Sequence, residues 1–126
     1  MIVRTLHEVG GTDLDVHGEG WRAVRLLTRA DGVGFSLSET TVDAGADMSI
    51  WYKHHQEACY VIEGSAEITE RDTGTVHRIG PGDAYAPEHD RHTIRVLEPL
   101  RLVCVFNPAL TGQETHDADG SYELVD

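Results

Sequence analysis

Residues 45–64 read GADMSIWYKHHQEACYVIEG, and this stretch decides the fold. Eight residues separate the glycine at position 45 from the polar run His54-His55-Gln56-Glu57. Six mostly apolar residues then separate Glu57 from Gly64. A short apolar run that ends at a glycine is typical of a buried β-strand bounded by a turn. We therefore expect one strand over 57–63 and a second over 66–70 that returns after Gly64.

The rest of the chain repeats this pattern of short strands between turns, without a linker or an internal repeat. Val33, Phe35 and Leu37 alternate with small residues, which is the period of a half-buried strand. The expected strands cover residues 21–27, 33–38, 57–63, 66–70, 75–79, 83–86, 92–96 and 100–106, and residues 1–4 read as the start of another. Roughly eight to ten short strands predict an all-β antiparallel sandwich or barrel.

Composition excludes several classes of function. The 126 residues, 40% hydrophobic and 25% charged, suit a single globular domain, and the net charge of −12 argues against a nucleic-acid partner. Apolar runs such as 58–62 and 102–106 are far shorter than the roughly 20 residues of a membrane helix. The N-terminus lacks the pattern of a signal peptide, so we expect a cytoplasmic protein without a membrane partner. In that compartment Cys59 and Cys104 are expected to be free thiols.

A second motif follows the first at Pro81-Gly82-Asp83, with Pro87 and His92 after it. In this order the two motifs resemble those of cupin proteins, which implies a jelly-roll barrel. Residues 50–53 stand where cupins usually carry a His-x-His pair, so the usual oxygenase site is not encoded. Glu57 and His92, with the phenol of Tyr85, remain as possible ligands for iron(II), manganese or zinc. The alternative is that this tyrosine and this histidine are ordinary core residues.

Four longer stretches are also distinctive: IWYKHHQEA at 50–58, HDRHT at 89–93, RLVCVFNPALTG at 101–112 and ETHD at 114–117. With them the chain resembles the ectoine synthase family over essentially its whole length. The resemblance implies a small cupin lyase, usually a homodimer, that closes N-γ-acetyl-L-2,4-diaminobutyrate into ectoine with loss of water. Ectoine is a compatible solute, so osmoprotection is the implied role. A divalent metal, Fe(II), is implied at Glu57, Tyr85 and His92.

The resemblance also implies which residues meet the substrate. The implied substrate-binding residues are Trp21, Arg25, Ser38, Thr40, Cys104 and Phe106, and the implied catalytic residues are Glu114, His116, His55 and Tyr52. We assign Arg25, with Thr40, to the substrate carboxylate because a guanidinium matches that group in geometry. The chain departs from the family at two places: one residue fewer separates Tyr85 from His92, and His54 replaces the usual asparagine.

Two matters stay open at this point. By composition alone, residues 107–126 are polar and turn-rich and favour a disordered tail, whereas the resemblance implies an ordered lid over the mouth of a single cupin domain spanning 1–126. A cupin of this size could also be a non-catalytic binding module for a small polar metabolite. It could equally be a related enzyme, such as an isomerase or an oxygenase, with a different small polar substrate.

Overall fold

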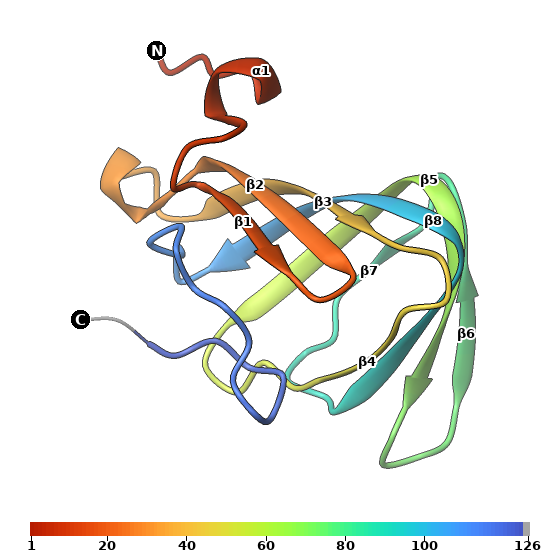
Figure 1. Ribbon diagram of the computed structural model, residues 1–126. Helices are drawn as coiled ribbons and strands as arrows, with labels where there is room; N and C mark the ends of the chain where they lie inside the picture. The colour runs from red at the N-terminus through yellow and green to blue at the C-terminus, as the bar shows by residue number, and fades with distance from the viewer. Residues whose placement is uncertain (125–126) are drawn as a thin grey trace.

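The computed structural model describes residues 1–124 as a strongly bent antiparallel β-sheet with one short helix (Figure 1). Its elements are α1 (Leu6–Val9), β1 (Asp15–Gly18), β2 (Trp21–Leu27), the 3-10 turn η1 (Arg29–Asp31), β3 (Ser36–Val42), β4 (Asp47–Ile50), β5 (Gln56–Glu70), β6 (Val76–Ile79), β7 (Ala84–Tyr85) and β8 (His92–Asn107). The strands lie in the order β1-β2-β3-β8-β5-β6, with β4 beside β8 and β7 beside β5. The all-β prediction is confirmed.

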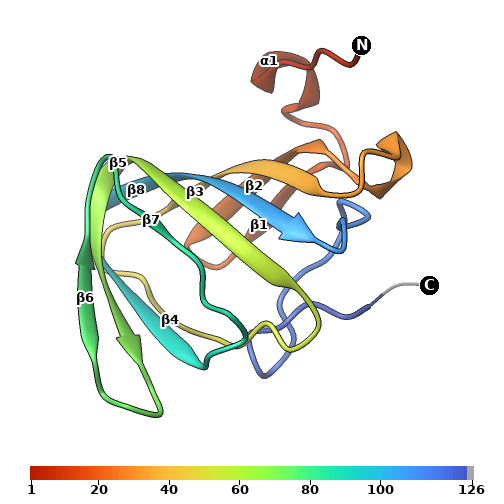
Figure 2. The ribbon, with the colours of Figure 1, turned by 180° about the vertical axis from the view of Figure 1, so that it is seen from behind.

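Two long strands, β5 and β8, form the spine of the barrel. They pair from Gln56 opposite Asn107 to Glu70 opposite His92, and both bend where the register shifts between Val61 and Ala66 (Figures 1 and 2). Gly64 lies at this bend with φ 85°, and a Cβ there would stand 2.0 Å from the Pro99 carbonyl oxygen. The predicted hairpin at Gly64 is therefore wrong: the glycine makes a bulge inside one strand. The predicted strands 92–96 and 100–106 are likewise one strand.

We expect Gly64→Ala to destabilise the fold more than Gly74→Ala. Both glycines have positive φ, but a Cβ at Gly74 meets nothing within 4 Å. Gly74→Ala should cost about 1 kcal/mol from backbone strain, and Gly64→Ala at least about 3 kcal/mol because the methyl group collides with backbone. Urea unfolding of the two variants measures the difference. Equal losses of stability would contradict the assignment of a close approach at Gly64.

Alternation along β5 and β8 separates a buried inner face from an exposed outer one. Cys59 and Val61 of β5 are buried, as are Leu102, Cys104 and Phe106 of β8. Residues beyond β8 complete this core, because Leu110, Ser121 and Tyr122 are also buried. The dark-blue C-terminal segment crosses the end of the barrel where β5 begins and β8 ends (Figure 1). The disordered tail that composition favoured is thus wrong for residues 108–124; residues 125–126, the end of the expected lid, lie outside the described residues.

In β3, the side chains that face inward are not the ones predicted. The strand begins at Ser36, and Val33 and Phe35 are exposed at 40% and 39%, while Ser36 and Ser38 are buried. Gly32 and Gly34 both have positive φ and keep residues 32–35 out of the strand. Small polar side chains occupy the inner face because β3 lines a cavity rather than a solid core.

The N-terminal residues 1–4 do not form the predicted strand. They precede α1, whose N-cap Thr5 accepts a hydrogen bond from the Glu8 N–H while the Glu8 side chain accepts one from the Thr5 N–H. This reciprocal cap stabilises a single turn of helix. No helix within residues 1–124 has the length and apolar character needed to span a membrane.

Candidate functional site

A cavity of about 50 Å³ lies inside the barrel, beneath the C-terminal segment. Strands β2, β3, β5 and β8 supply its walls, and His116 and Tyr122 close it from the C-terminal side. Ten of the residues expected in the site line this cavity: Trp21, Arg25, Ser38, Thr40, Tyr52, Glu57, Tyr85, Cys104, Phe106 and His116. The other three, His55, Glu114 and His92, lie around it and are described below.

Arg25 is the only arginine that lines the cavity, and its side chain is almost fully buried. Its Nη2 donates to the Tyr122 hydroxyl at 3.3 Å, and its Nη1 lies 4.0 Å from the Glu114 carboxylate. Its Nε and Nη1 have no hydrogen-bond partner. Buried polar groups are almost always paired, so two nitrogen atoms without partners on a buried guanidinium indicate a missing anionic partner.

Glu114 is held by the turn that contains it. Its carboxylate accepts from the backbone N–H groups of Thr111, Gly112 and Gln113 and from the Thr111 hydroxyl. Burial raises the pKa of Glu114, but these hydrogen bonds outweigh burial and lower the pKa overall. A carboxylate so fully bonded is a weak base, so the geometry favours a positioning role beside Arg25 over proton transfer.

An aromatic cluster forms the side of the cavity next to the C-terminal segment. The Tyr52 hydroxyl lies 2.7 Å from His116 Nε2, and the His116 ring stacks on Tyr122 with centroids 4.6 Å apart. Trp21 and Phe106 complete the cluster through edge-to-face contacts. Tyr122 was missed by sequence reasoning, because a single tyrosine in a polar, turn-rich segment gives no periodic signal.

Burial sets the protonation of the hydrogen-bonded pair Tyr52–His116. Burial and the charge of Arg25 lower the pKa of His116 to about 4, so the imidazole is neutral at pH 7. Burial also raises the pKa of Tyr52 well above its ordinary value, so the phenol keeps its proton. The pair therefore presents a neutral donor and a neutral acceptor to the cavity.

This protonation makes the docking of the C-terminal segment sensitive to acid. The unfolded chain protonates His116 near its ordinary pKa of 6.5, whereas the folded chain resists until about 4. The contribution of His116 to stability is therefore full above pH 6.5 and falls as the pH drops towards 4, by up to about 3 kcal/mol. We expect the acid-dependent loss to be smaller in His116→Gln than in wild type, as measured by urea unfolding across that range; the lowered pKa values of His55 and His92 account for the loss that remains. His54→Gln, at an exposed position, is the control; parallel losses in wild type and His116→Gln would contradict the prediction.

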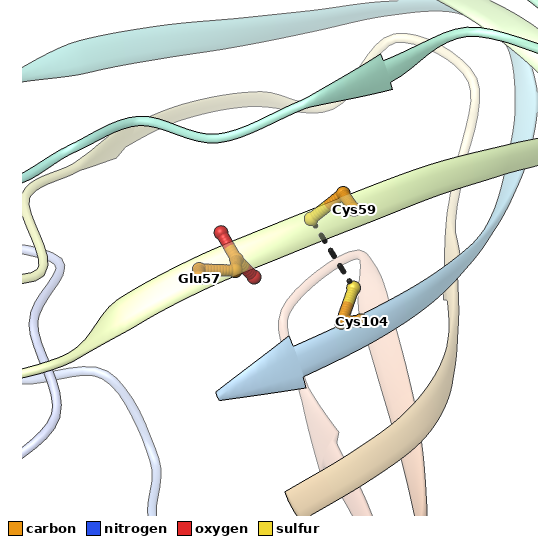
Figure 3. Close-up of side chains that lie close together, drawn as sticks. All are labelled: Glu57, Cys59 and Cys104. Carbon is orange, nitrogen blue, oxygen red and sulfur yellow. Dashed lines mark hydrogen bonds between the residues drawn. The ribbon is translucent and has the colours of Figure 1, made fainter. Parts of the chain in front are cut away.

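Glu57 lies next to two thiols on the inner face of β5 and β8. Cys59 and Cys104 are opposite one another in the register, with their Sγ atoms 3.5 Å apart and not bonded, and the Glu57 carboxyl is beside them (Figure 3). One donor atom from each of the three side chains lies within 4.8 Å of the others, which makes the group a possible cation site. Burial raises the pKa of Glu57 to about 7, so a cation there would favour its charged form.

The structure brings Tyr85 close to Glu57 but places His92 in the neighbouring hollow. Tyr85 pairs with Cys59 across the sheet and lines both this hollow and the cavity. His92 is buried; its Nδ1 lies 3.0 Å from the Asp90 carbonyl oxygen, and its Nε2 has no partner. A histidine that donates through one ring nitrogen to a carbonyl and leaves the other free has the arrangement of a metal ligand. The donor set Glu57, Tyr85 and His92 is thus chemically suited to a divalent cation.

The loop before His92 is where the chain is one residue shorter than expected. Glu88 and His89 both have positive φ, at 54° and 68°, which is uncommon for residues other than glycine. His89 Nδ1 lies 2.9 Å from the Tyr52 carbonyl oxygen, so the loop contacts the cavity wall. The loop between Tyr85 and His92 is closed by these two left-handed residues.

His55 lies just outside the cavity wall. It is buried, its Nδ1 has no partner, and its ring meets the edges of Phe106 and Tyr122. Burial lowers the pKa of His55, so this imidazole is also uncharged at neutral pH. Its place behind two aromatic rings favours a supporting contact over a direct one.

Comparison with known proteins identifies close relatives of the whole chain. The family model described as ectoine synthase matches residues 1–126. An L-ectoine synthase of Desulfosudis oleivorans is 54% identical over 128 aligned residues, covering 100% of this chain and 99% of that protein. An L-ectoine synthase of Thermobifida fusca is 48% identical over 126 aligned residues, covering 99% of this chain and 94% of that protein.

Solved structures of other proteins have the same fold as this chain. The crystal structure of ectoine synthase from P. lautus superposes with a TM-score of 0.84 at 46% identity, covering 89% of this chain and 81% of that chain. An RmlC-like cupin from Shewanella frigidimarina superposes with a TM-score of 0.61 at 21% identity, covering 75% of this chain and 82% of that chain, and shows the fold alone. The predicted cupin-type barrel is confirmed.

Proposed function

The chain belongs to the ectoine synthase family, and from that premise we propose that the cavity beneath its C-terminal segment binds and cyclises the substrate. An ectoine synthase converts N-γ-acetyl-L-2,4-diaminobutyrate into ectoine with loss of water. The observation that carries the assignment of the site is Arg25, whose buried guanidinium belongs to the cavity lining and has two nitrogen atoms, Nε and Nη1, without hydrogen-bond partners. The substrate carries a carboxylate that suits those groups.

The reaction requires three contributions from the protein: proton transfer, stabilisation of charge on the carbonyl oxygen, and positioning of the substrate. The substrate's α-amine attacks its acetamide carbonyl carbon, and the resulting carbinolamine loses water to give the cyclic amidine. An ammonium is not a nucleophile, so a proton must leave the amine first. Developing charge on the carbonyl oxygen needs stabilisation, and that oxygen must be protonated before it departs. The substrate must also be held bent, with amine and carbonyl in contact.

Binding and bending are assigned to the walls of the cavity. Arg25 fixes the carboxylate at one end, with Ser38 and Thr40 beside it on β3. Trp21 and Phe106 present apolar surface on either side of the Tyr52–His116 pair, which excludes water from the bent chain. Cys104 adds a small apolar contact on β8. A bound carboxylate at Arg25 would also satisfy the two free N–H groups.

Proton transfer is assigned to the Tyr52–His116 pair. The neutral His116 imidazole can accept a proton through the Tyr52 hydroxyl, to which it is hydrogen-bonded at 2.7 Å, and can return it to the departing oxygen. In this relay the Tyr52 oxygen takes the proton from the amine as its own hydrogen passes to His116 Nε2, so the phenol stays neutral. Glu114 holds Arg25 and the C-terminal turn, and His55 supports Phe106.

A divalent metal is part of this proposal, with Fe(II) as the ion and Glu57, Tyr85 and His92 as the residues that would hold it. The buried Glu57 carboxyl and the free Nε2 of His92 support the assignment. Such an ion supplies Lewis-acid polarisation of a substrate oxygen. The remaining steps use the side chains already described.

We propose that residues 107–126 act as a lid on a single cupin domain. Small-molecule sites usually enclose at least about 300 Å³, far more than the cavity of about 50 Å³ present here. The segment therefore has to move for the substrate to enter. It is held by contacts that can reform, such as the Trp51 N–H to Gly120 carbonyl bond at 3.1 Å and the Lys53–Asp119 ion pair at 2.8 Å.

We also propose that the protein is a cytoplasmic homodimer. Exposed apolar side chains gather near the N-terminus at Ile2, Val3 and Leu6, and Arg4 binds Asp31 of η1, close to exposed Val33. An exposed apolar patch of this kind suits a contact between two copies. Light scattering of the purified protein tests the dimer by its mass.

Direct assay tests the assigned activity and separates it from simple binding. Purified protein is incubated with N-γ-acetyl-L-2,4-diaminobutyrate and Fe(II), and the product is followed by NMR. We expect ectoine to accumulate with one water lost per turn. Binding of the substrate without any cyclic product would indicate a non-catalytic metabolite-binding cupin instead.

A further inference from the structure

The two cysteines inside the barrel have no role in the reaction that requires sulfur chemistry. Cys59 and Cys104 are both nearly fully buried, at 2% and 4% exposure, and come from the two longest strands. Directly opposite positions in an antiparallel pair fix the two side chains side by side on one face of the sheet. Their Sγ atoms are consequently held 3.5 Å apart without a bond.

This separation matches the spacing of two sulfur ligands on one metal ion. Two thiolates on a tetrahedral zinc, each bonded at about 2.3 Å, stand about 3.8 Å apart. The observed 3.5 Å requires a shift of only a few tenths of an ångström. The Glu57 carboxyl offers a third donor within 4.8 Å of both sulfur atoms (Figure 3), and its flexible side chain can close the remaining distance.

We propose that Glu57, Cys59 and Cys104 form a cation site for a thiophilic divalent ion such as Zn²⁺ or Cd²⁺. Sulfur ligands select such ions over Mg²⁺, Ca²⁺ and Mn²⁺, which prefer oxygen. Two thiolates neutralise a divalent ion, which suits a buried site. The geometry of these three side chains is the observation that supports the site.

A consequence for activity follows, and it rests on the function proposed above. Glu57 belongs to both the sulfur-containing site and the proposed iron site, so the two ions compete for that carboxylate. A thiophilic ion therefore displaces the productive metal and inhibits the enzyme. The chain would be sensitive to Cd²⁺ through a residue, Cys59, that has no place in the proposed catalytic site.

Titration of the reduced, full-length protein with Cd²⁺ tests the site by a readout independent of activity. We expect sulfur-to-cadmium charge-transfer absorption that saturates at one ion per chain. Cys59→Val and Cys59→Ser should each lower the Cd²⁺ affinity by at least about 100-fold, since loss of even an outer partner costs 10- to 100-fold. Wild-type affinity and absorption in both variants would overturn the proposal, as would the absence of the band in wild type whose thiols are shown to be reduced.

Two further measurements separate this site from the iron site. Glu57→Gln should keep the sulfur-to-cadmium band with weaker Cd²⁺ binding and should lose iron. Inhibition by Cd²⁺, measured for each protein against its own rate without cadmium, should need at least about 100-fold more Cd²⁺ in Cys59→Val than in wild type. If the iron assignment is wrong, the band and its dependence on Cys59 remain while the inhibition is lost. If the sulfur site is wrong, the band is absent in every variant.

Discussion

Glu57→Gln is expected to lower the rate of ectoine formation by about 1000-fold or more, together with loss of bound metal, while the barrel still folds. The substitution keeps the shape of the side chain but removes the anionic ligand, and a bound metal supplies several kcal/mol of transition-state stabilisation. Elemental analysis gives the metal content, NMR gives the rate, and circular dichroism checks the fold.

Glu63→Gln is the matched control for this prediction. It lies on the same strand as Glu57, but its carboxylate is exposed and pairs with Arg101 at 3.5 Å on the outer surface. We expect wild-type metal content and rate from it. A Glu57→Gln variant that retains both metal and rate, or wild type that is fully active after its metal is removed, would refute the proposed role of Glu57.

Arg25→Gln is expected to lower kcat/KM by about 100- to 1000-fold. Removing one partner of a buried charge pair typically costs about 2–5 kcal/mol, and Arg25 is the only arginine lining the cavity. The effect should fall mainly on KM, because the substrate carboxylate keeps the same charge in the ground state and in the transition state. Steady-state kinetics with wild type and variant measure the split between kcat and KM.

A substrate without a carboxylate shows whether Arg25 acts through that group. N-(3-aminopropyl)acetamide has the same amine and acetamide but no carboxylate, so wild type and Arg25→Gln should cyclise it at similar rates. Arg22→Gln, on the outer face of the same strand where Arg22 pairs with Asp15, is the control and should behave as wild type. If Arg25→Gln loses activity equally on both substrates, the residue is structural, through Tyr122 and Glu114.

The strand content was predictable because alternation and short apolar runs act locally. The error at Gly64 has a tertiary cause: Glu63-Gly64 has the local chemistry of a turn, and only the approach of Pro99 from β8 makes it a bulge. The prediction of which β3 side chains face inward was wrong for a related reason. An apolar side chain is expected inside, but here Ser38 lines the cavity and the buried Ser36 hydroxyl accepts a hydrogen bond from the Leu110 N–H.

The short helix α1 was missed although its signal was present. Thr5 and Glu8 have the spacing of a capping box, but a single turn has too few residues to show helical periodicity. The start of the chain was assigned to a strand on its apolar residues alone. The capping box, rather than periodicity, is the signal in this sequence that predicts the helix.

The site was predictable only in part, because its members come from many separate elements. Spacing left Glu57, Tyr85 and His92 as possible ligands, and the remaining residues came from the resemblance. Neither indicated that Cys59 faces Cys104, since the register of β5 against β8 depends on the bulge at Gly64. The four hydrogen bonds to the Glu114 carboxylate could not be predicted from the sequence either, because they depend on the conformation of one turn.

The position of bound product tests the central claim most directly. Crystals of this protein grown with Fe(II) and ectoine should show the product inside the barrel, with its carboxylate on the free N–H groups of Arg25 and its ring between Trp21 and Phe106. Density for the product anywhere outside that cavity, such as the hollow beside His77 and Glu70, would contradict the account.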